Sequence, residues 1–507
     1  MRTAQALAIA GGPPTVPPGS HEPWPEITAA DRAALERVLD RGVLWGPNAP
    51  EVTALEEEWS AYVGTRFCLL TNSGTAALHC AVVVAGVGPG DEVIVPAFSF
   101  VATAMAVLHA GAVPVFSDID PRLQTIDTAR IEELITPRTK AVMPVHVHGL
   151  PADMEEIQEI AARHRLAVVE DAAQASGAVY RGTRAGGLGD SAGFSLNGSK
   201  LLAAGEGGLF VTDDEQALVA ARRLAIFGED TPPLTRPARY RAYWAHGTGW
   251  NYRSNELVAA LARSQLRRLD GHVATAQRNA AVLTAGLAEL PGVEPPYVPP
   301  DRTCAFYRYR IRINPDELGF EGRAVELRDR LLCALQAEGV AASLWQLLPL
   351  PAQPVFRRRG FSPWRPGDSE SLEPWVRDAH PEAARLLESS IVLGTADEPI
   401  FNQPSGLMER YVEAFEKVIE GIESGDRGLS TGAALAPGGE LASGAALAAG
   451  AGPASGAGPA SGAGPASGAV AMRPRPMRGS APACSACPAG GSGPVERDSC
   501  PPGCAGG

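Results

Sequence analysis

Lysine, the side chain that forms imines with aldehydes, occurs only three times among the 44 basic residues of this 507-residue chain. Lys140 lies just ahead of a strand-like run and Lys417 lies in an amphipathic helical pattern, so both are expected at the surface. Lys200 lies between residues 197–199 (NGS) and 205–208 (GEGG), whose small size lets a bulky ligand approach the backbone. We therefore favour Lys200 as the amine of an imine-forming site, although an exposed loop lysine fits this segment equally well when it is taken alone.

Two adjacent carboxylates, Glu170 and Asp171, end the apolar run 166–171. Successive strand residues point to opposite faces, and the end of a central strand borders the crevice where open α/β sheets bind ligands. A buried carboxylate needs a cation or several donors to stay ionised, and the protonated ring nitrogen of pyridoxal phosphate is such a cation. A structural acceptor or a helix cap is the alternative role for this pair.

Other residues have the chemistry to hold the remainder of such a cofactor. The segment 73–75 (SGT) opens a helix directly after a strand, where free backbone amides and the helix dipole favour a phosphate. Ser195, five residues before Lys200, adds a hydroxyl donor. Phe100 is able to stack on a flat ring, although an ordinary core position also explains an aromatic residue there.

Metal binding has weaker support. His146 and His148 share one face of an expected strand, but the sequence places no third ligand beside them. Four cysteines near the end of the chain have the spacing C-x2-C-x12-C-x3-C, which formally resembles a zinc site. Their surroundings are Gly, Pro, Ala and Ser, so we favour disordered, reduced thiols; these cysteines are Cys484, Cys487, Cys500 and Cys504.

Strand and helix signals alternate in the part of the chain that carries these residues, which predicts βαβ units and a mostly parallel sheet with helices on both faces. The expected strands are Phe67–Thr71, Glu92–Pro96, Val113–Ser117, 141–147, 166–171 and 193–196. The expected helices are Ala102–His109, 128–135 and Met154–His164. Further helices are expected near 321–338 and 407–422, in a second and less regular α+β part.

The domain organisation follows from these patterns. We expect an N-terminal arm (1–29), a large domain (30–269), a small C-terminal domain (270–425) and a disordered tail (426–507) that contains GPASGA three times. The net charge of −13 argues against a nucleic-acid binder, and no apolar run reaches the ~18 residues that a membrane span needs. These features favour a cytoplasmic protein without a membrane partner.

From about Trp24 to Ile422 the chain resembles the DegT/DnrJ/StrS aminotransferases, a family of fold-type-I pyridoxal-phosphate enzymes. The resemblance depends on an ordered set of motifs. These are residues 72–78 (NSGTAAL), 95–100 (VPAFSF), 144–146 (PVH), 170–175 (EDAAQA), 194–200 (FSLNGSK), 205–208 (GEGG) and 250–253 (WNYR). It implies an α/β fold with a large mixed sheet, a smaller α+β C-terminal domain and pyridoxal 5′-phosphate (PLP) as the cofactor.

The resemblance also implies a role for each matching residue. Lys200 would bind the cofactor's aldehyde and carry the proton, and Asp171 would pair with the pyridinium nitrogen. The remaining implied cofactor contacts are Gln174 near the phenolic oxygen, Gly74, Thr75 and Ser195 at the phosphate, Phe100 over the ring, and Asn251 at the phosphate of a neighbouring subunit. The last contact implies a homodimer with shared active sites. Arg253 and His148 have possible substrate contacts, but structural hydrogen bonds explain both.

The expected reaction is transfer of an amino group from glutamate or glutamine to a keto-sugar or keto-cyclitol, by ping-pong chemistry. Residues 8–13 (AIAGGP) resemble members that serve aminocyclitol and related antibiotic pathways. Leu196 departs from the family pattern, which often has an aromatic residue after the serine. A PLP-dependent dehydration or elimination, and a non-catalytic PLP-binding regulator, are the alternatives. The presence of Lys200 favours transamination.

Overall fold

The computed structural model describes residues 6–46, 48–229, 244–357 and 377–423. The predicted tail from residue 426, with its four cysteines, and most of the 357–359 arginine run lie outside these ranges. None of the helices within them is both long and apolar enough to cross a lipid bilayer.

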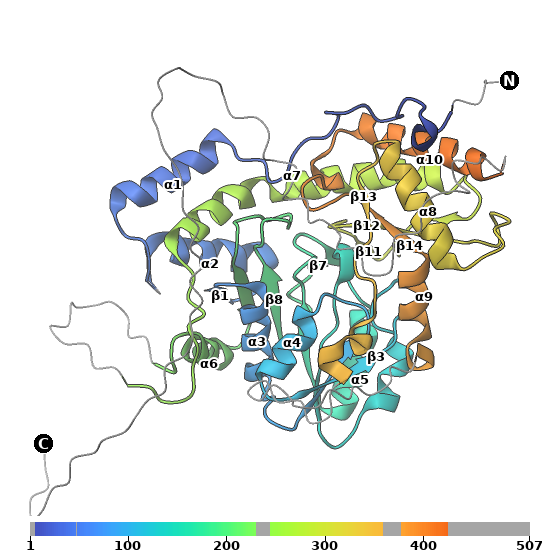
Figure 1. Cartoon of the computed structure of the whole chain (residues 1–507). Coiled ribbons are helices and arrows are strands. Elements are labelled where there is room, and N and C mark those ends of the chain that lie inside the picture. The colour runs from blue at the N-terminus through green and yellow to red at the C-terminus, as the bar shows by residue number, and fades with distance from the viewer. Residues whose placement is uncertain (1–5, 47, 230–243, 358–376, 424–507) are drawn as a thin grey trace, which may run out of the picture. The chain divides into compact units, whose positions relative to one another are not determined.

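A seven-stranded mixed sheet forms the centre of the first half of the chain (Figure 1). Its order is β1 (Phe67–Thr71), β9 (Gly208–Thr212), β8 (Ser191–Ser195), β5 (Ala167–Asp171), β4 (Thr139–Val142), β2 (Glu92–Pro96) and β3 (Val113–Ser117). The pairs from β8 to β3 are parallel, and β9 is antiparallel to both of its neighbours. All strands except β9 therefore run in the same direction, and their carboxyl ends lie at one edge.

Helices cover both faces of this sheet, as the alternation of signals predicts. On one face α3 (Gly74–Val84), α4 (Ala102–His109) and α6 (Glu215–Ala225) pack on Val93, Val95 and Val169. On the other face α5 (Met154–His164) packs on Ile94, Val142 and Val168. The side chains of β2 and β5 thus alternate between the two layers, which confirms the predicted α/β class.

Two predicted elements need correction. The expected strand 141–147 ends at Val142, because Pro144 has no amide hydrogen to donate to a ladder; a 3-10 turn, Val147–Gly149, follows. His148 lies in that turn with φ of 56°, so the two histidines do not share a strand face. The expected helix 128–135 is a pair of 3-10 turns, Thr128–Arg130 and Glu132–Leu134, because the backbone is already extended at Ile135, ahead of Pro137.

The second half of the described chain has its own core. A four-stranded antiparallel sheet has the order β10 (Val293–Glu294), β12 (Tyr309–Ile313), β14 (Ser390–Leu393) and β13 (Ala342–Ser343). It packs with α8 (Ala324–Ala337) and α10 (Ser405–Glu423), which confirms the two helices predicted there. Leu7 and Val16 of the N-terminal arm are buried in the same core.

The remaining elements connect and cover these parts. They are α1 (Ala29–Arg41), α2 (Pro50–Val63), α7 (Glu256–Leu287), α9 (Pro381–Ser389) and a small sheet of β11 (Arg302–Thr303), β6 (Val179–Tyr180) and β7 (Thr183–Arg184). Helix α7 contributes Leu269 to the core around α2 and Leu283 to the C-terminal core. The predicted boundary between residues 269 and 270 falls inside this helix, and the division into domains stays a prediction.

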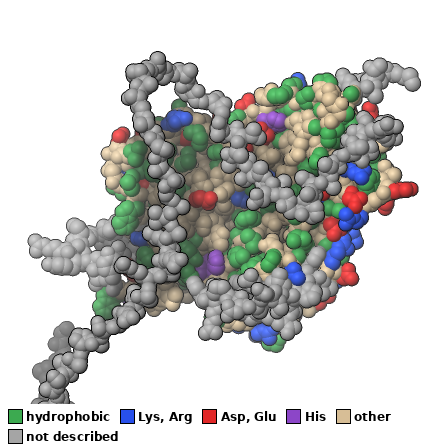
Figure 2. All heavy atoms as spheres, in the orientation of Figure 1, with side chains coloured by type: hydrophobic (Ala, Val, Ile, Leu, Met, Phe, Trp, Pro, Cys, Tyr) green, Lys and Arg blue, Asp and Glu red, His purple; other side chains and the backbone are tan. Residues whose placement is uncertain are grey.

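On the face drawn in Figure 2, acidic and basic side chains are interspersed at the edge formed by α8 and α9.

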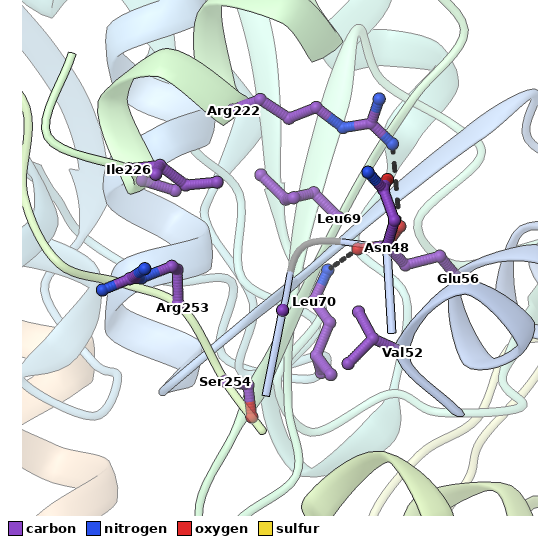
Figure 3. A pocket seen from close by; sticks show the side chains of 11 residues that line it. Asn48, Val52, Glu56, Leu69, Leu70, Arg222, Ile226, Arg253 and Ser254 are labelled. Carbon is purple, nitrogen blue, oxygen red and sulfur yellow. Dashed lines mark hydrogen bonds and ion pairs between the residues drawn. The ribbon is translucent and has the colours of Figure 1, made fainter. Parts of the chain in front are cut away.

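A pocket of about 190 Å³ between α2, β1 and α6 contains an unusual carboxylate (Figure 3). Glu56 is 8% exposed; it accepts a hydrogen bond from the Leu70 amide at 2.9 Å and lies 3.7 Å from Arg222. Burial raises the pKa of Glu56 to about 7, although the Leu70 amide and the Arg222 charge oppose the rise. The folded protein therefore holds this proton more tightly than the unfolded chain does.

We predict that this carboxyl makes the protein less stable as the pH rises from 5 to 8. Its stabilising contribution is complete below the unfolded value near 4.5 and is lost as pH rises through about 7. Glu56→Gln keeps an acceptor for Leu70 but cannot ionise, so it should remove on the order of 2–3 kcal/mol of this pH dependence. Urea unfolding at pH 5 and pH 8 measures it. Glu36→Gln, at an exposed position of α1 away from this pocket, should leave the dependence unchanged, and equal slopes for all three proteins would contradict the assignment.

Candidate active site

The common edge of the large sheet gathers the predicted site residues. Ser73 follows β1, Asp171 ends β5, Ser195 ends β8, and Gly208 begins the reversed strand β9. Since six strands share one direction, these four chain segments meet at one edge although they lie far apart in sequence. The segment after β2, which carries Phe100, reaches the same edge.

Lys200 is the lysine at this edge. Its Nζ lies 4.1 Å from the centre of the Tyr307 ring, and it interacts electrostatically with Asp171. Burial lowers the pKa of the Lys200 ammonium, whereas Tyr307 and Asp171 oppose that change. The side chain is thus partly removed from water, which favours the neutral, reactive form of the amine.

The other two lysines differ from it and from each other. Lys140 is exposed, as predicted, and lies within β4. The surface prediction for Lys417 is wrong: its side chain is 12% exposed and its Nζ lies 2.8 Å from Glu338. Glu338 also accepts hydrogen bonds from the Ala8 and Thr15 amides, so this buried carboxylate joins α10 to the N-terminal arm. A structural ion pair leaves Lys417 no free amine for chemistry.

Asp171 is a buried carboxyl group with two hydrogen-bond donors and no cation in direct contact among the described residues. Its Oδ2 accepts a hydrogen bond from the Thr103 hydroxyl at 2.6 Å, and its Oδ1 accepts one from the Ala173 amide at 3.1 Å. Burial raises the pKa of Asp171, opposed by these two donors and by the charge of Lys200. A protonated ring nitrogen beside it would offset the cost of that burial, so the residue fits a pyridinium partner.

Glu170, on the opposite face of β5, has a structural role. It accepts hydrogen bonds from the amides of Gly186, Leu188 and Gly189 at 2.6–2.7 Å and contacts His146 Nε2 at 2.8 Å. His146 Nδ1 accepts from the Ala152 amide, so Nε2 carries the hydrogen donated to Glu170. The pair is completely buried and leaves His146 no position for a metal. Within the part of the chain that the structure describes, no three His, Cys, Asp or Glu side chains form a group able to hold a metal ion.

The start of α3 forms a cradle suited to a phosphate. Its first amides have no partner within the helix, and Ser73 Oγ caps the helix by accepting from the Ala76 amide at 3.1 Å. A Cβ at Gly74 would lie 2.9 Å from Ser195 Cβ, and one at Gly208 would lie 2.2 Å from the Ser73 carbonyl oxygen. The two glycines therefore bring Ser195 and β9 against the amide of Thr75 and its neighbours.

The remaining predicted residues occupy distinct positions. Gln174 Oε1 accepts a hydrogen bond from the His148 amide at 2.8 Å, whereas Phe100 is 52% exposed at the sheet edge. Asn251 is exposed; its Oδ1 accepts from Arg253 Nε at 3.1 Å, and its carbonyl accepts from the Asn72 side chain. These contacts place the 250–253 motif beside the segment that opens α3.

Sequence reasoning missed several residues of this site. Thr103, which bonds Asp171, lies three residues after Phe100 on α4, so a helical reading of residues 100–103 would have placed it at the same edge. Tyr307, which contacts Lys200, and Arg308 and Arg310 beyond it come from the irregular second half. No local pattern there predicts that Tyr307 contacts Lys200 or that Arg310 contacts His148.

Comparison of the sequence with known proteins identifies its family and several relatives. Residues 25–368 match the DegT/DnrJ/EryC1/StrS aminotransferase family. GDP-perosamine synthase of Caulobacter vibrioides is 41% identical over 290 residues, which cover 57% of this chain and 74% of that protein. The putative L-glutamine:3-amino-2,3-dideoxy-scyllo-inosose aminotransferase of Streptomyces kanamyceticus is 36% identical over 339 residues, 66% of this chain and 78% of that protein.

A solved structure of a related protein has the same fold. The structure of 3-amino-5-hydroxybenzoic acid synthase superposes with a TM-score of 0.69 at 30% identity and covers 79% of this chain and 99% of that chain. The half-buried Lys200 beside Asp171, the cradle at α3 and the match over residues 25–368 agree on one assignment. The chain belongs to the DegT/DnrJ/EryC1/StrS family and is a PLP-dependent aminotransferase of the sugar and cyclitol class.

Proposed function

We propose that the protein transfers the amino group of glutamate or glutamine to the ketone of a keto-sugar or keto-cyclitol, in the biosynthesis of an aminosugar or aminocyclitol natural product. The observation that carries the proposal is the desolvated amine of Lys200 between Asp171 and Tyr307. Two relatives, the GDP-perosamine synthase and the putative L-glutamine:3-amino-2,3-dideoxy-scyllo-inosose aminotransferase, support this substrate class. The second of these relatives also supports glutamine as the donor.

Each residue at the sheet edge has a role in this proposal. Bound PLP supplies an electron sink for the amino-acid carbon. Asp171 would keep the ring nitrogen protonated, and Gln174 would contact the phenolic oxygen. Gly74, Thr75 and Ser195 would hold the phosphate, and Phe100 would cover the ring. Lys200 moves the proton at the reacting carbon, and its lowered pKa leaves more of the amine able to accept that proton.

A homodimer is part of the proposal. Arg253 lies over the exposed rings of Trp45 and Phe227, at 5.4 Å and 5.2 Å from their centres, next to Asn251. Exposed aromatic side chains around an arginine are typical of a surface that a partner covers. A second subunit seated there would let Asn251 reach the neighbouring phosphate.

We also propose that the enzyme is cytoplasmic, since the described cysteines Cys68, Cys80, Cys304 and Cys333 are free thiols.

The donor half of the reaction gives the first test. Purified protein with PLP should show the visible absorbance band of the bound cofactor, and glutamate or glutamine should bleach it to the amine form. Adding a keto-sugar or keto-cyclitol should then restore the band. A band that neither donor changes would argue for dehydration, elimination or a non-catalytic role.

Lys200→Ala should abolish this chemistry. The variant has no amine at the sheet edge, so the normal visible band should be absent and turnover should fall by at least about 10³-fold. Lys140→Ala, which removes an exposed lysine, is the matched control and should keep both the band and the activity. Survival of the normal band in Lys200→Ala would show that another residue binds the aldehyde.

Gly208→Ala should weaken PLP binding, because its Cβ would overlap the Ser73 carbonyl oxygen and displace the start of α3. Overpacking of this kind costs about 1–3 kcal/mol, which corresponds to a roughly 5- to 150-fold rise in the Kd for PLP. Gly271→Ala, in α7 with open space around the added methyl, should leave that Kd unchanged. Fluorescence titration of apoprotein with PLP measures both, and equal Kd values would contradict the assigned cradle.

A further inference from the structure

Four arginines are buried in the described part of the chain, and they fall into two pairs. Arg302 contacts Asp153 at 2.5 Å and Asp301 at 2.8 Å, and Arg328 contacts Asp329 at 2.7 Å. Arg308 and Arg310 are just as buried, yet neither has a carboxylate of the described residues within 4 Å. A buried guanidinium without an anion is costly, so this second pair requires an explanation.

Arg310 contacts only neutral groups. It donates to His148 Nε2 at 3.0 Å, to Ser390 Oγ at 2.5 Å and to the Trp345 carbonyl at 2.7 Å. Burial lowers the pKa of Arg310 to about 9, and the charge of Arg328 adds to the shift. Three bonds leave two of the five guanidinium hydrogens without an acceptor in these contacts.

Arg308 is likewise a buried guanidinium without a carboxylate in contact among the described residues. Its Nη1 donates to the Thr395 carbonyl at 2.7 Å, the Tyr307 side chain also interacts with it, and Asp397 attracts it only from beyond ion-pair distance. Burial lowers the pKa of Arg308. The fold thus holds two guanidinium groups, two residues apart in sequence, in a region with no carboxylate to neutralise them among the described residues.

His148 provides a separate sign of a missing ligand. Its Nε2 accepts a hydrogen bond from Arg310, so the neutral ring carries its hydrogen on Nδ1. His148 is 6% exposed, and Nδ1 is completely buried without a hydrogen-bond partner. Burial and the nearby cations hold the pKa of His148 well below its usual range, so the ring stays a neutral donor.

These three side chains line one small cavity, together with Arg122 and Tyr297. Its volume of about 20 Å³ admits one or two water-sized groups, about the size of the two oxygens of a carboxylate. Because no acidic side chain lines it, the cavity is electropositive.

Two contacts join the cavity to the reacting amine. Lys200 Nζ and Arg308 Cζ lie 4.1 Å and 4.5 Å from the centre of the same Tyr307 ring. The His148 amide donates to Gln174, the residue expected at the cofactor's phenolic oxygen. The cavity therefore adjoins the site of amino-group transfer.

We propose that Arg308, Arg310 and His148 form a subsite that binds the carboxylate of the amino donor. Guanidinium groups match a planar carboxylate with paired hydrogen bonds, and every amino-acid donor brings one to Lys200. A phosphate already has its own cradle at the start of α3. The subsite rests on the proposed aminotransferase function, and it explains why the fold supplies no acidic side chain to these arginines.

Separate half-reactions test the assignment. Arg310→Gln should raise the donor concentration that half-bleaches the cofactor band by about 10-fold or more, while the KM for the ketone changes less than about 2-fold. Arg308→Gln should act in the same direction. Arg312→Gln is the matched control, because Arg312 lies on the same strand but pairs with Glu294 at the surface. An unchanged donor requirement overturns the proposal, and so does a raised ketone KM alone, which would assign the subsite to a carboxylate of the acceptor.

A measurement without turnover separates this proposal from the proposed function. Glutarate, a dicarboxylate that cannot be transaminated, should raise the Tm of the PLP-loaded wild type and of Arg312→Gln, whereas uncharged glutaramide should not. Arg310→Gln should lose the shift. If glutarate stabilises wild type and Arg310→Gln equally, or stabilises neither, the subsite is refuted. A shift that depends on Arg310, in a protein whose band no donor bleaches, supports the subsite and refutes only the aminotransferase function.

Discussion

The partial removal of Lys200 from water is the constraint on which the rest of the site depends. An amine at an exposed loop is almost entirely protonated at neutral pH, so it is a poor nucleophile and a poor base. Burial beside Tyr307 and Asp171 changes that balance while one carboxylate remains near enough to offset the charge. The sheet edge achieves this because strands of one direction end together and the second half of the chain covers them. Tyr307, from that second half, completes the enclosure.

The cost of burying charge also explains why Glu170 and Asp171 have different roles. Glu170 and Asp171 are neighbours in sequence, yet the alternation of β5 sends them into different surroundings. Three amides and His146 saturate Glu170, so it fixes the loop after β7 and has no capacity for a ligand. Asp171 receives only two donors and keeps its capacity for a cation. Arg308 and Arg310 are the opposite case: cations whose described surroundings contain no anion in contact.

The sequence predicted what depends on local pattern. Apolar alternation and turn residues located six of the seven strands of the large sheet, and the short motifs around Ser73, Asp171 and Lys200 identified the parts of the site that lie next to strand ends. Contacts between distant segments were not predictable. Lys417 has an ordinary helical surface pattern, and only the folded N-terminal arm reveals its pairing with Glu338. Arg310 likewise reads as one more alternating residue of a strand, because its missing partner is a property of the packed structure.

Trapping of the cofactor on the chain shows directly whether Lys200 is the amine that binds it. Reduction of the PLP-loaded protein with borohydride, followed by proteolysis and mass spectrometry, locates the lysine that binds the aldehyde. With only three lysines in the sequence, the assignment is unambiguous. We expect the pyridoxyl phosphate label on Lys200 alone. A label on Lys140 or Lys417, or no lysine label in protein that shows the cofactor band, would contradict it.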